Sequence, residues 1–112
     1  MTRTDVHYLI TPPSPAEFEA LYATTGWGSP SRADVVRALA GSWLAAVARD
    51  DDGRAVAMAR VISDGALHAF VTEVVVQPDR RGEGIGAALV RALVQECAQR
   101  GVRDVQLFAA AG

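Results

Sequence analysis

The chain has 112 residues, which is enough for one domain built around one hydrophobic core. Half of the residues are hydrophobic, and the formal net charge of −2 gives no support for nucleic acid or a membrane surface as a partner. The single cysteine, Cys97, excludes an internal disulfide. The sequence shows neither a membrane-span pattern nor a signal-peptide pattern, so we expect a cytoplasmic protein with a single domain over residues 1–112.

The N-terminal part is predicted to hold a short strand and two helices. Residues 6–10 form the strand candidate, which ends before two prolines. Ser14-Pro15-Ala16-Glu17 is a capping box with proline at the first helical position, and it predicts a helix that ends near residues 25–26. Ser31 is predicted to cap a second helix, with Gly41 at its end.

The middle of the chain has the pattern of three strands. Residues 43–49 and 54–62 are strand-like and are joined by Asp50-Asp51-Asp52-Gly53, a strong hairpin signal. A second turn at Ser63-Asp64-Gly65 leads into a longer strand over residues 67–76. Successive strands joined by short turns predict an antiparallel meander.

The last part predicts a crossover. A helix over residues 84–100 carries apolar side chains at helical spacing, and a final strand follows over residues 102–108. Strand, helix and strand make a βαβ unit, so the strands at 67–76 and 102–108 should be parallel. The predicted fold is therefore α/β with a mixed sheet (α+β): an antiparallel meander followed by a βαβ crossover.

A glycine-rich loop, residues 80–86, joins the Val-rich strand to this helix. Glycines at a helix start let a ligand approach the backbone, and the exposed N–H groups there favour an anion, so we predict a phosphate cradle. Gly82-x-Gly84-x-x-Ala87 also matches a loose dinucleotide fingerprint, but such a turn follows its strand directly and does not end an antiparallel meander. A nucleotide P-loop would need Gly-Lys-Ser/Thr, and a plain tight turn would need only one glycine.

The residues Arg81-x-x-Gly84-x-Gly86, after a Val-rich strand and Gln77-Pro78, resemble the acetyl-coenzyme A motif of the GNAT-type N-acetyltransferase superfamily. The order of predicted elements is also similar over nearly the whole chain. The resemblance implies an acetyl-CoA-dependent N-acetyltransferase that acts on a primary amine of a small molecule or protein, with no metal. It places the pyrophosphate on backbone N–H groups from Arg81 through Ala87, with Arg80 adding positive charge. The implied cofactor-binding residues are Val74, Val75, Val76, Arg80, Arg81, Gly82, Glu83, Gly84, Ile85, Gly86 and Ala87.

The resemblance also implies a general base on the strand before the loop, and Glu73 is the only acidic residue between Gly65 and Pro78. Strand alternation is expected to place Glu73 on one face with Val71 and Val75. In the alternative interpretation, Glu73 lies at an exposed sheet edge or pairs with an arginine such as Arg60. The candidate acceptor-site residues are Tyr22, Trp27, Arg60 and Asp64, while His68 and Cys97 are expected to be structural.

Similar proteins continue with a further helix and strands, including the tyrosine usually proposed to protonate the leaving thiolate. This sequence ends at Gly112 and offers no residue for that role. The strand at 102–108 would then be an exposed edge, which a second copy in a homodimer could cover. The alternative to an enzyme is a non-catalytic acyl-CoA-binding, regulatory or dimerisation module of the same fold.

Overall fold

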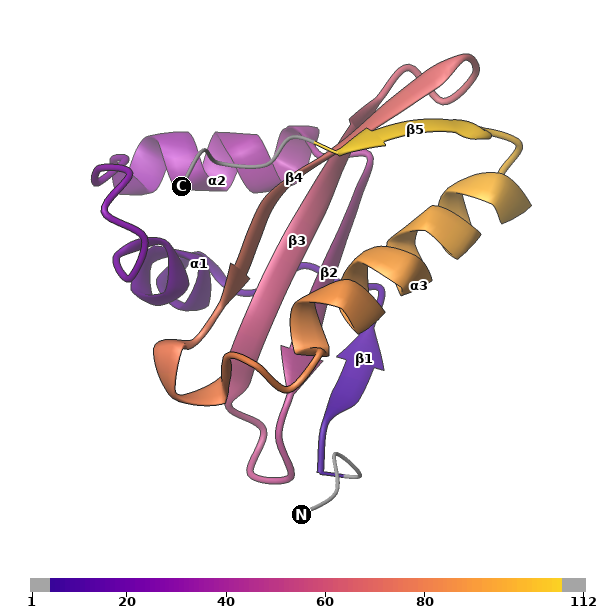
Figure 1. Cartoon of the computed structure of the whole chain (residues 1–112). Helices are drawn as coiled ribbons and strands as arrows, with labels where there is room; N and C mark the ends of the chain where they lie inside the picture. Colours follow the sequence, from indigo (N-terminus) through magenta and orange to yellow (C-terminus); the bar gives the residue numbers. More distant parts are fainter. Residues whose placement is uncertain (1–4, 108–112) are drawn as a thin grey trace.

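In the computed structural model, residues 5–107 are described, and they form a five-stranded sheet with helices on both faces (Figure 1). The elements in chain order are β1 (His7–Leu9), α1 (Pro15–Tyr22), α2 (Arg32–Gly41), β2 (Leu44–Arg49), β3 (Ala55–Ser63), β4 (His68–Val76), the 3-10 helix η1 (Pro78–Arg80), α3 (Ile85–Gln99) and β5 (Asp104–Leu107). In this part of the chain, no helix is long and apolar enough to cross a membrane.

The sheet has the order β1-β2-β3-β4-β5, and its first four strands are antiparallel neighbours. β4 and β5 are parallel, and their register runs from His68↔Asp104 to Val71↔Leu107. The meander and the crossover predicted from the sequence are therefore confirmed, as is the mixed α+β class. The predicted residue Phe108 at the end of the last strand lies outside the described residues.

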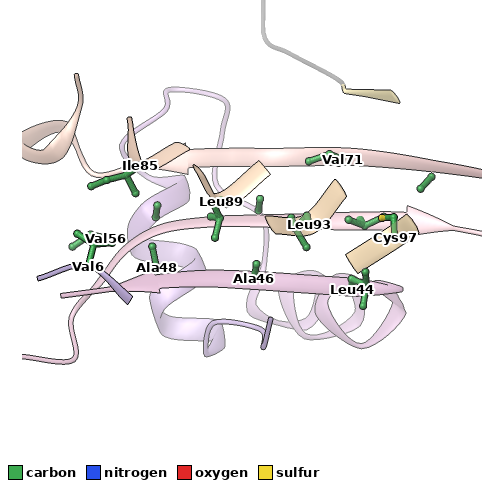
Figure 2. Close-up of a cluster of buried hydrophobic side chains, with 14 of the residues drawn as sticks. Val6, Leu44, Ala46, Ala48, Val56, Val71, Ile85, Leu89, Leu93 and Cys97 are labelled. Carbon is green, nitrogen blue, oxygen red and sulfur yellow. The ribbon is translucent and has the colours of Figure 1, made fainter. Parts of the chain in front are cut away.

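α3 covers one face of the sheet because its apolar side chains recur every four residues. Figure 2 shows Ile85, Leu89, Leu93 and Cys97 along this side of the helix, and all are buried. The strands below offer small residues to this helix, namely Ala46, Ala48, Ala57, Ala59 and Ala69. Burial raises the pKa of the Cys97 thiol, which fits the predicted structural role.

α1 and α2 cover the opposite face and bury Phe18, Leu21 and Val35 against it. The predicted capping box is confirmed, since the Ser14 hydroxyl accepts the Glu17 N–H and the Glu17 carboxylate accepts the Ser14 N–H. Glu17 also receives two hydrogen bonds from the Arg49 guanidinium of β2, at 2.6 and 2.9 Å. These bonds lower the pKa of Glu17 from 4.5 to about 2.

β4 contains a bulge that the sequence did not predict. Met58 pairs with Val75 and Arg60 pairs with Thr72, so Ala59 alone stands opposite two residues of β4. Glu73 lies at this point with a φ of 50°, and it is the one non-glycine residue with positive φ in the described part of the chain. The bulge fixes the place where β4 changes the face toward which its side chains point.

The expectation that Glu73 shares a face with both Val71 and Val75 is therefore wrong. Val71 packs into the cluster under α3, whereas Val75 packs into the cluster under α1 and α2. Beyond the bulge, Val74 and Val76 are the residues that face α3. The extra residue inverts the alternation, because the side-chain period of a strand is two.

Candidate functional site

The glycine-rich loop turns the chain from β4 into α3. η1 follows β4 directly, and both Gly82 and Gly84 then have a φ of 81°, in the left-handed region that favours glycine. Gly84 is the N-cap of α3, and a Cβ at either glycine would meet nothing within 4 Å. The backbone here is thus open to a ligand, as the phosphate-cradle prediction requires.

The amide groups of this loop are free to donate. Within residues 5–107, the N–H groups of residues 82–87 have no hydrogen-bond acceptor, and the first helical bond runs from the Ala88 N–H to the Gly84 carbonyl at 3.1 Å. Successive free N–H groups at the positive end of a helix form an anion site. The predicted range is one residue too long, because the Arg81 N–H donates to the Pro78 carbonyl at 3.4 Å.

Gly86 serves a different purpose from the glycines before it. A Cβ at this position would lie 3.2 Å from a methyl carbon of Val76 and 3.8 Å from one of Val74. The missing side chain lets the first turn of α3 lie close against the end of β4. The loop and the end of β4 therefore form one continuous surface.

The two arginines of the loop differ in their surroundings. The Arg80 guanidinium contacts Glu83 at 3.1 Å and Asp5 at 3.3 Å, and these carboxylates raise its pKa. Arg80 thus connects the segment before β1 to the loop, and its charge is already balanced there. Arg81 is exposed, donates from Nε to the Val76 carbonyl at 3.1 Å, and has no carboxylate partner among the described residues.

The outer edge of β4 is open beside this loop. β5 pairs with β4 only as far as Val71, and no other strand within residues 5–107 pairs with the outer edge at Val74, Val75 and Val76. An extended ligand could add to such an edge through main-chain hydrogen bonds. The described part of the sheet therefore has the opening that the predicted pantetheine position needs.

Glu73 is held by an arginine in the middle of the sheet. The Arg60 Nε donates to one Glu73 carboxylate oxygen, and the Thr72 hydroxyl donates to the other at 3.2 Å. Arg60 also donates to the Ser42 hydroxyl at 3.3 Å, at the C-terminal end of α2. The Glu73 and Arg60 side chains are 20% and 17% exposed, so the alternative predicted from the sequence, an ion pair with Arg60, is confirmed.

A pocket of about 140 Å³ opens above this ion pair, between α1 and α2. It is lined by Phe18, Tyr22, Pro30, Asp34, Val35, Ala38, Arg60 and Glu73. Two candidate acceptor residues, Tyr22 and Arg60, are therefore brought together with the candidate base. Phe18, Asp34 and Ala38 were missed, since the sequence only marked them as parts of amphipathic, capped helices.

The remaining candidate residues lie elsewhere. Trp27 packs edge-on against Tyr22, with ring centroids 5.7 Å apart, and is absent from the pocket lining. Asp64 accepts the N–H groups of Ala66, Leu67 and His68 in its turn, and these bonds lower its pKa. The prediction that Asp64 binds the acceptor is not supported, because its carboxylate stabilises the turn.

No group of three or more His, Cys, Asp or Glu side chains in residues 5–107 is arranged to hold a metal ion. His68, from the sequence analysis, lies 2.6 Å from Asp104 of the neighbouring strand, a contact that joins β4 to β5. The features that could carry chemistry are thus the amide-lined loop, the open edge of β4 and the pocket above Glu73.

Comparison with known proteins shows similarity to acetyltransferases. Residues 5–111 match the family model of the acetyltransferase (GNAT) family. Serotonin N-acetyltransferase 2, chloroplastic, from Oryza sativa subsp. japonica is 40% identical over 67 residues, which cover 60% of this chain and 34% of the relative. The chain spans from 24% to 45% of the length of the first curated relatives that it matches.

Solved structures agree in fold. An acetyltransferase assigned to the GNAT family from Xanthomonas campestris pv. campestris has a TM-score of 0.78 and 33% identity, and the match covers 94% of this chain and 75% of that one. A GNAT family acetyltransferase from Brucella melitensis, in complex with acetyl-CoA, has a TM-score of 0.71 and 24% identity, covering 96% of this chain and 77% of that one.

Proposed function

Because the chain belongs to the acetyltransferase (GNAT) family, we propose that it transfers the acetyl group of acetyl-CoA to a primary amine. The observation that carries this proposal is the row of free N–H groups at residues 82–87, directly beside an open strand edge. This loop is suited to a pyrophosphate, and the edge is suited to the amide-bearing pantetheine arm. The pocket above Glu73 supplies a separate place for the amine.

Each proposed cofactor contact follows from the geometry of the loop. The N–H groups of residues 82–87 hold the pyrophosphate, and the positive end of α3 adds to the attraction. Arg81 supplies the charge that Arg80 cannot, because Arg80 is already paired with Asp5 and Glu83. Val74, Val75 and Val76 provide the strand edge for the pantetheine arm.

When bound, acetyl-CoA supplies a thioester whose carbonyl carbon accepts the amine nitrogen as the carbon–sulfur bond breaks. Glu73 removes the proton that the amine must lose before it attacks. Arg60 and Thr72 use two of its lone-pair sites, which leaves the remaining ones to accept from the amine, directly or through a water. A backbone N–H near the bulge polarises the thioester carbonyl.

The proposal is tested by measuring the melting temperature with CoA and the consumption of acetyl-CoA with a panel of primary amines. All eleven basic residues are arginine, so no lysine of the chain competes as an acceptor. We expect CoA to raise the melting temperature and at least one amine to be acetylated. An unchanged melting temperature at millimolar CoA would contradict the proposal.

A second candidate is a non-catalytic acyl-CoA-binding module, and the Arg60–Glu73 ion pair is the observation that favours it. A carboxylate held by a half-buried arginine also has a structural explanation, since the pair joins β3, β4 and α2. Under this alternative CoA still binds, but acetyl-CoA is not consumed with any amine. Glu73→Gln separates the two functions, because a catalytic Glu73 predicts a lower kcat with an unchanged Kd for CoA.

We also propose a cytoplasmic location and a homodimer. The free, buried Cys97 suits a reducing compartment. β5 is the last strand of the described sheet, and Leu107 on it is 54% exposed, which suits pairing with a second copy. Light scattering coupled to size-exclusion chromatography tests the assembly, and a monomer at micromolar concentration would contradict it.

A further inference from the structure

The pocket above Glu73 has two apolar walls, one formed by α1 and the other by α2. Phe18 and Tyr22 lie one turn apart on α1, and their rings stack with centroids 5.6 Å apart. Val35 and Ala38 of α2 form the facing wall. A ligand between the two helices therefore contacts aromatic rings on one side and aliphatic groups on the other.

The size of the pocket limits what these walls can hold. An apolar cavity of about 150 Å³ is large enough for benzene. The pocket has a volume of about 140 Å³, so one six-membered ring fits within it. It is smaller than the roughly 300–1,000 Å³ of sites that take larger ligands.

Both carboxylates of the pocket are paired with arginines, Glu73 with Arg60 and Asp34 with Arg37. The ionisable lining groups of the pocket are Asp34, Arg60 and Glu73. The Asp34 side chain is 58% exposed and that of Glu73 only 20%, so Glu73 marks the inner end and Asp34 the outer end. Arg60 is occupied by Glu73 and Ser42. The Glu73 carboxylate keeps lone-pair sites that Arg60 and Thr72 do not use, and these sites can accept a hydrogen bond from an amine at the inner end.

We propose that the acceptor is a small primary monoamine that carries a single ring on a short linker. The ring lies between the walls formed by Phe18, Tyr22, Val35 and Ala38, and the amine lies at Glu73. This inference rests on the proposed function and names the substrate class of the same site. The amine nitrogen forms the amide bond as the carbon–sulfur bond of the thioester breaks, the amine proton passes to Glu73, and CoA leaves as the thiolate, which takes a proton from water.

Two other classes of amine fit the pocket less well. A polyamine would place a second ammonium group between the apolar walls or beside Asp34, whose carboxylate is already paired with Arg37. A peptide N-terminus would bring several amide groups between the same walls, where the Tyr22 hydroxyl is the one side-chain group that can pair with them. Both classes are therefore expected to be poor acceptors and serve as arms of the test.

The test compares kcat/KM for phenethylamine, spermidine and a short peptide with an N-terminal alanine, at saturating acetyl-CoA. We expect the kcat/KM for phenethylamine to be higher than that for the other two amines by about tenfold or more. Differences of this size are typical of how well an apolar group fits a pocket. A preference for spermidine or for the peptide, or no acetylation of phenethylamine, would overturn the inference while leaving the proposed function in place.

A variant pair tests the pocket itself. Ala38→Leu fills part of the volume, so the KM for phenethylamine should rise about tenfold while the KM for acetyl-CoA stays within about twofold. Ala40→Leu is the matched control, because Ala40 is exposed on the same helix and is not part of the pocket lining. Equal phenethylamine KM values for the two variants would contradict the assignment.

Binding is also measured apart from catalysis. Phenethylamine is titrated into the full chain without CoA, and the ring resonances of Phe18 and Tyr22 are followed by NMR. Saturable shifts at these rings support the pocket as an amine site whether or not CoA binds. A failure of CoA to bind would overturn only the proposed function. Without shifts at these rings, the inference fails whether or not CoA binds.

Discussion

The substitution of Gly84 by glutamate tests two properties of the loop, namely its left-handed backbone conformation and its space for an anion. Gly84 has a φ of 81° and leaves open space around its Cα. Any L side chain there costs about 1–2 kcal/mol of stability, because the left-handed conformation is strained. Gly84→Ala should therefore destabilise the protein by this amount, and Gly84→Asn by less, since asparagine tolerates the conformation.

Glutamate adds a charge to this strain. Two like charges about 4 Å apart repel by about 1 kcal/mol in bulk water and about 4 kcal/mol at an effective dielectric constant of 20. The loop is exposed, so we expect a value between these limits. About 2.8 kcal/mol corresponds to a hundredfold weaker Kd for CoA. Gly84→Ala keeps the free amide groups and should weaken binding by less than about tenfold.

The assay is isothermal titration calorimetry with CoA, after the melting temperature of each variant shows that it is folded at the assay temperature. Gly101→Glu is the matched control, because Gly101 has a φ of 92°, open surroundings and a place at the opposite end of α3. It should lose stability without losing CoA affinity. Equal CoA affinity in Gly84→Glu and the wild type would refute the assignment of the loop.

Three further predictions concern other parts of the molecule. Glu73→Gln should lower kcat by about 10²–10⁴-fold with an unchanged Kd for CoA, and an unchanged kcat would remove Glu73 from the mechanism. Arg80→Ala should weaken CoA binding by about tenfold, because its two carboxylate partners lose their counter-ion beside the loop, and Arg80→Lys should restore most of the affinity. Glu17 has a lowered pKa in the folded state, so its ion pair with Arg49 stabilises the protein above pH 4.5 and is lost as the pH falls toward about 2. Urea unfolding at pH 6 and pH 3 should show a smaller loss of stability for Glu17→Gln than for the wild type, by about 1 kcal/mol after solvent screening of an unscreened difference of about 2 kcal/mol, and equal losses would contradict this.

The features that the sequence predicts well are local ones. The capping box at Ser14, the hairpin at residues 50–53 and the helix after Gly84 are each specified by a few neighbouring residues. The order of strands follows from the lengths of their connections. For the same reason, the position of the glycine-rich loop at the start of this helix could be predicted, while its contact with a pyrophosphate stays a prediction.

The features that the sequence does not predict depend on distant contacts. The bulge at Glu73 carries no glycine or asparagine signal, and it changes which face of β4 each later valine occupies. Arg80 has one partner within the loop, Glu83, but its second partner, Asp5, lies 75 positions away and could not be predicted. Asp34 joins the pocket only through the packing of α1 against α2. In each case, residues that are distant in the sequence determine the surroundings of the side chain, and the neighbouring residues alone do not reveal them.

The most direct test of the cofactor site is a titration of the ¹⁵N-labelled chain with CoA, followed by amide NMR. We expect the largest saturable shifts on the N–H groups of residues 82–87, which have no acceptor within residues 5–107, and on Val74–Val76 along the open edge of β4. Unchanged resonances at millimolar CoA, or shifts that cluster elsewhere in the molecule, would contradict this assignment of the cofactor site.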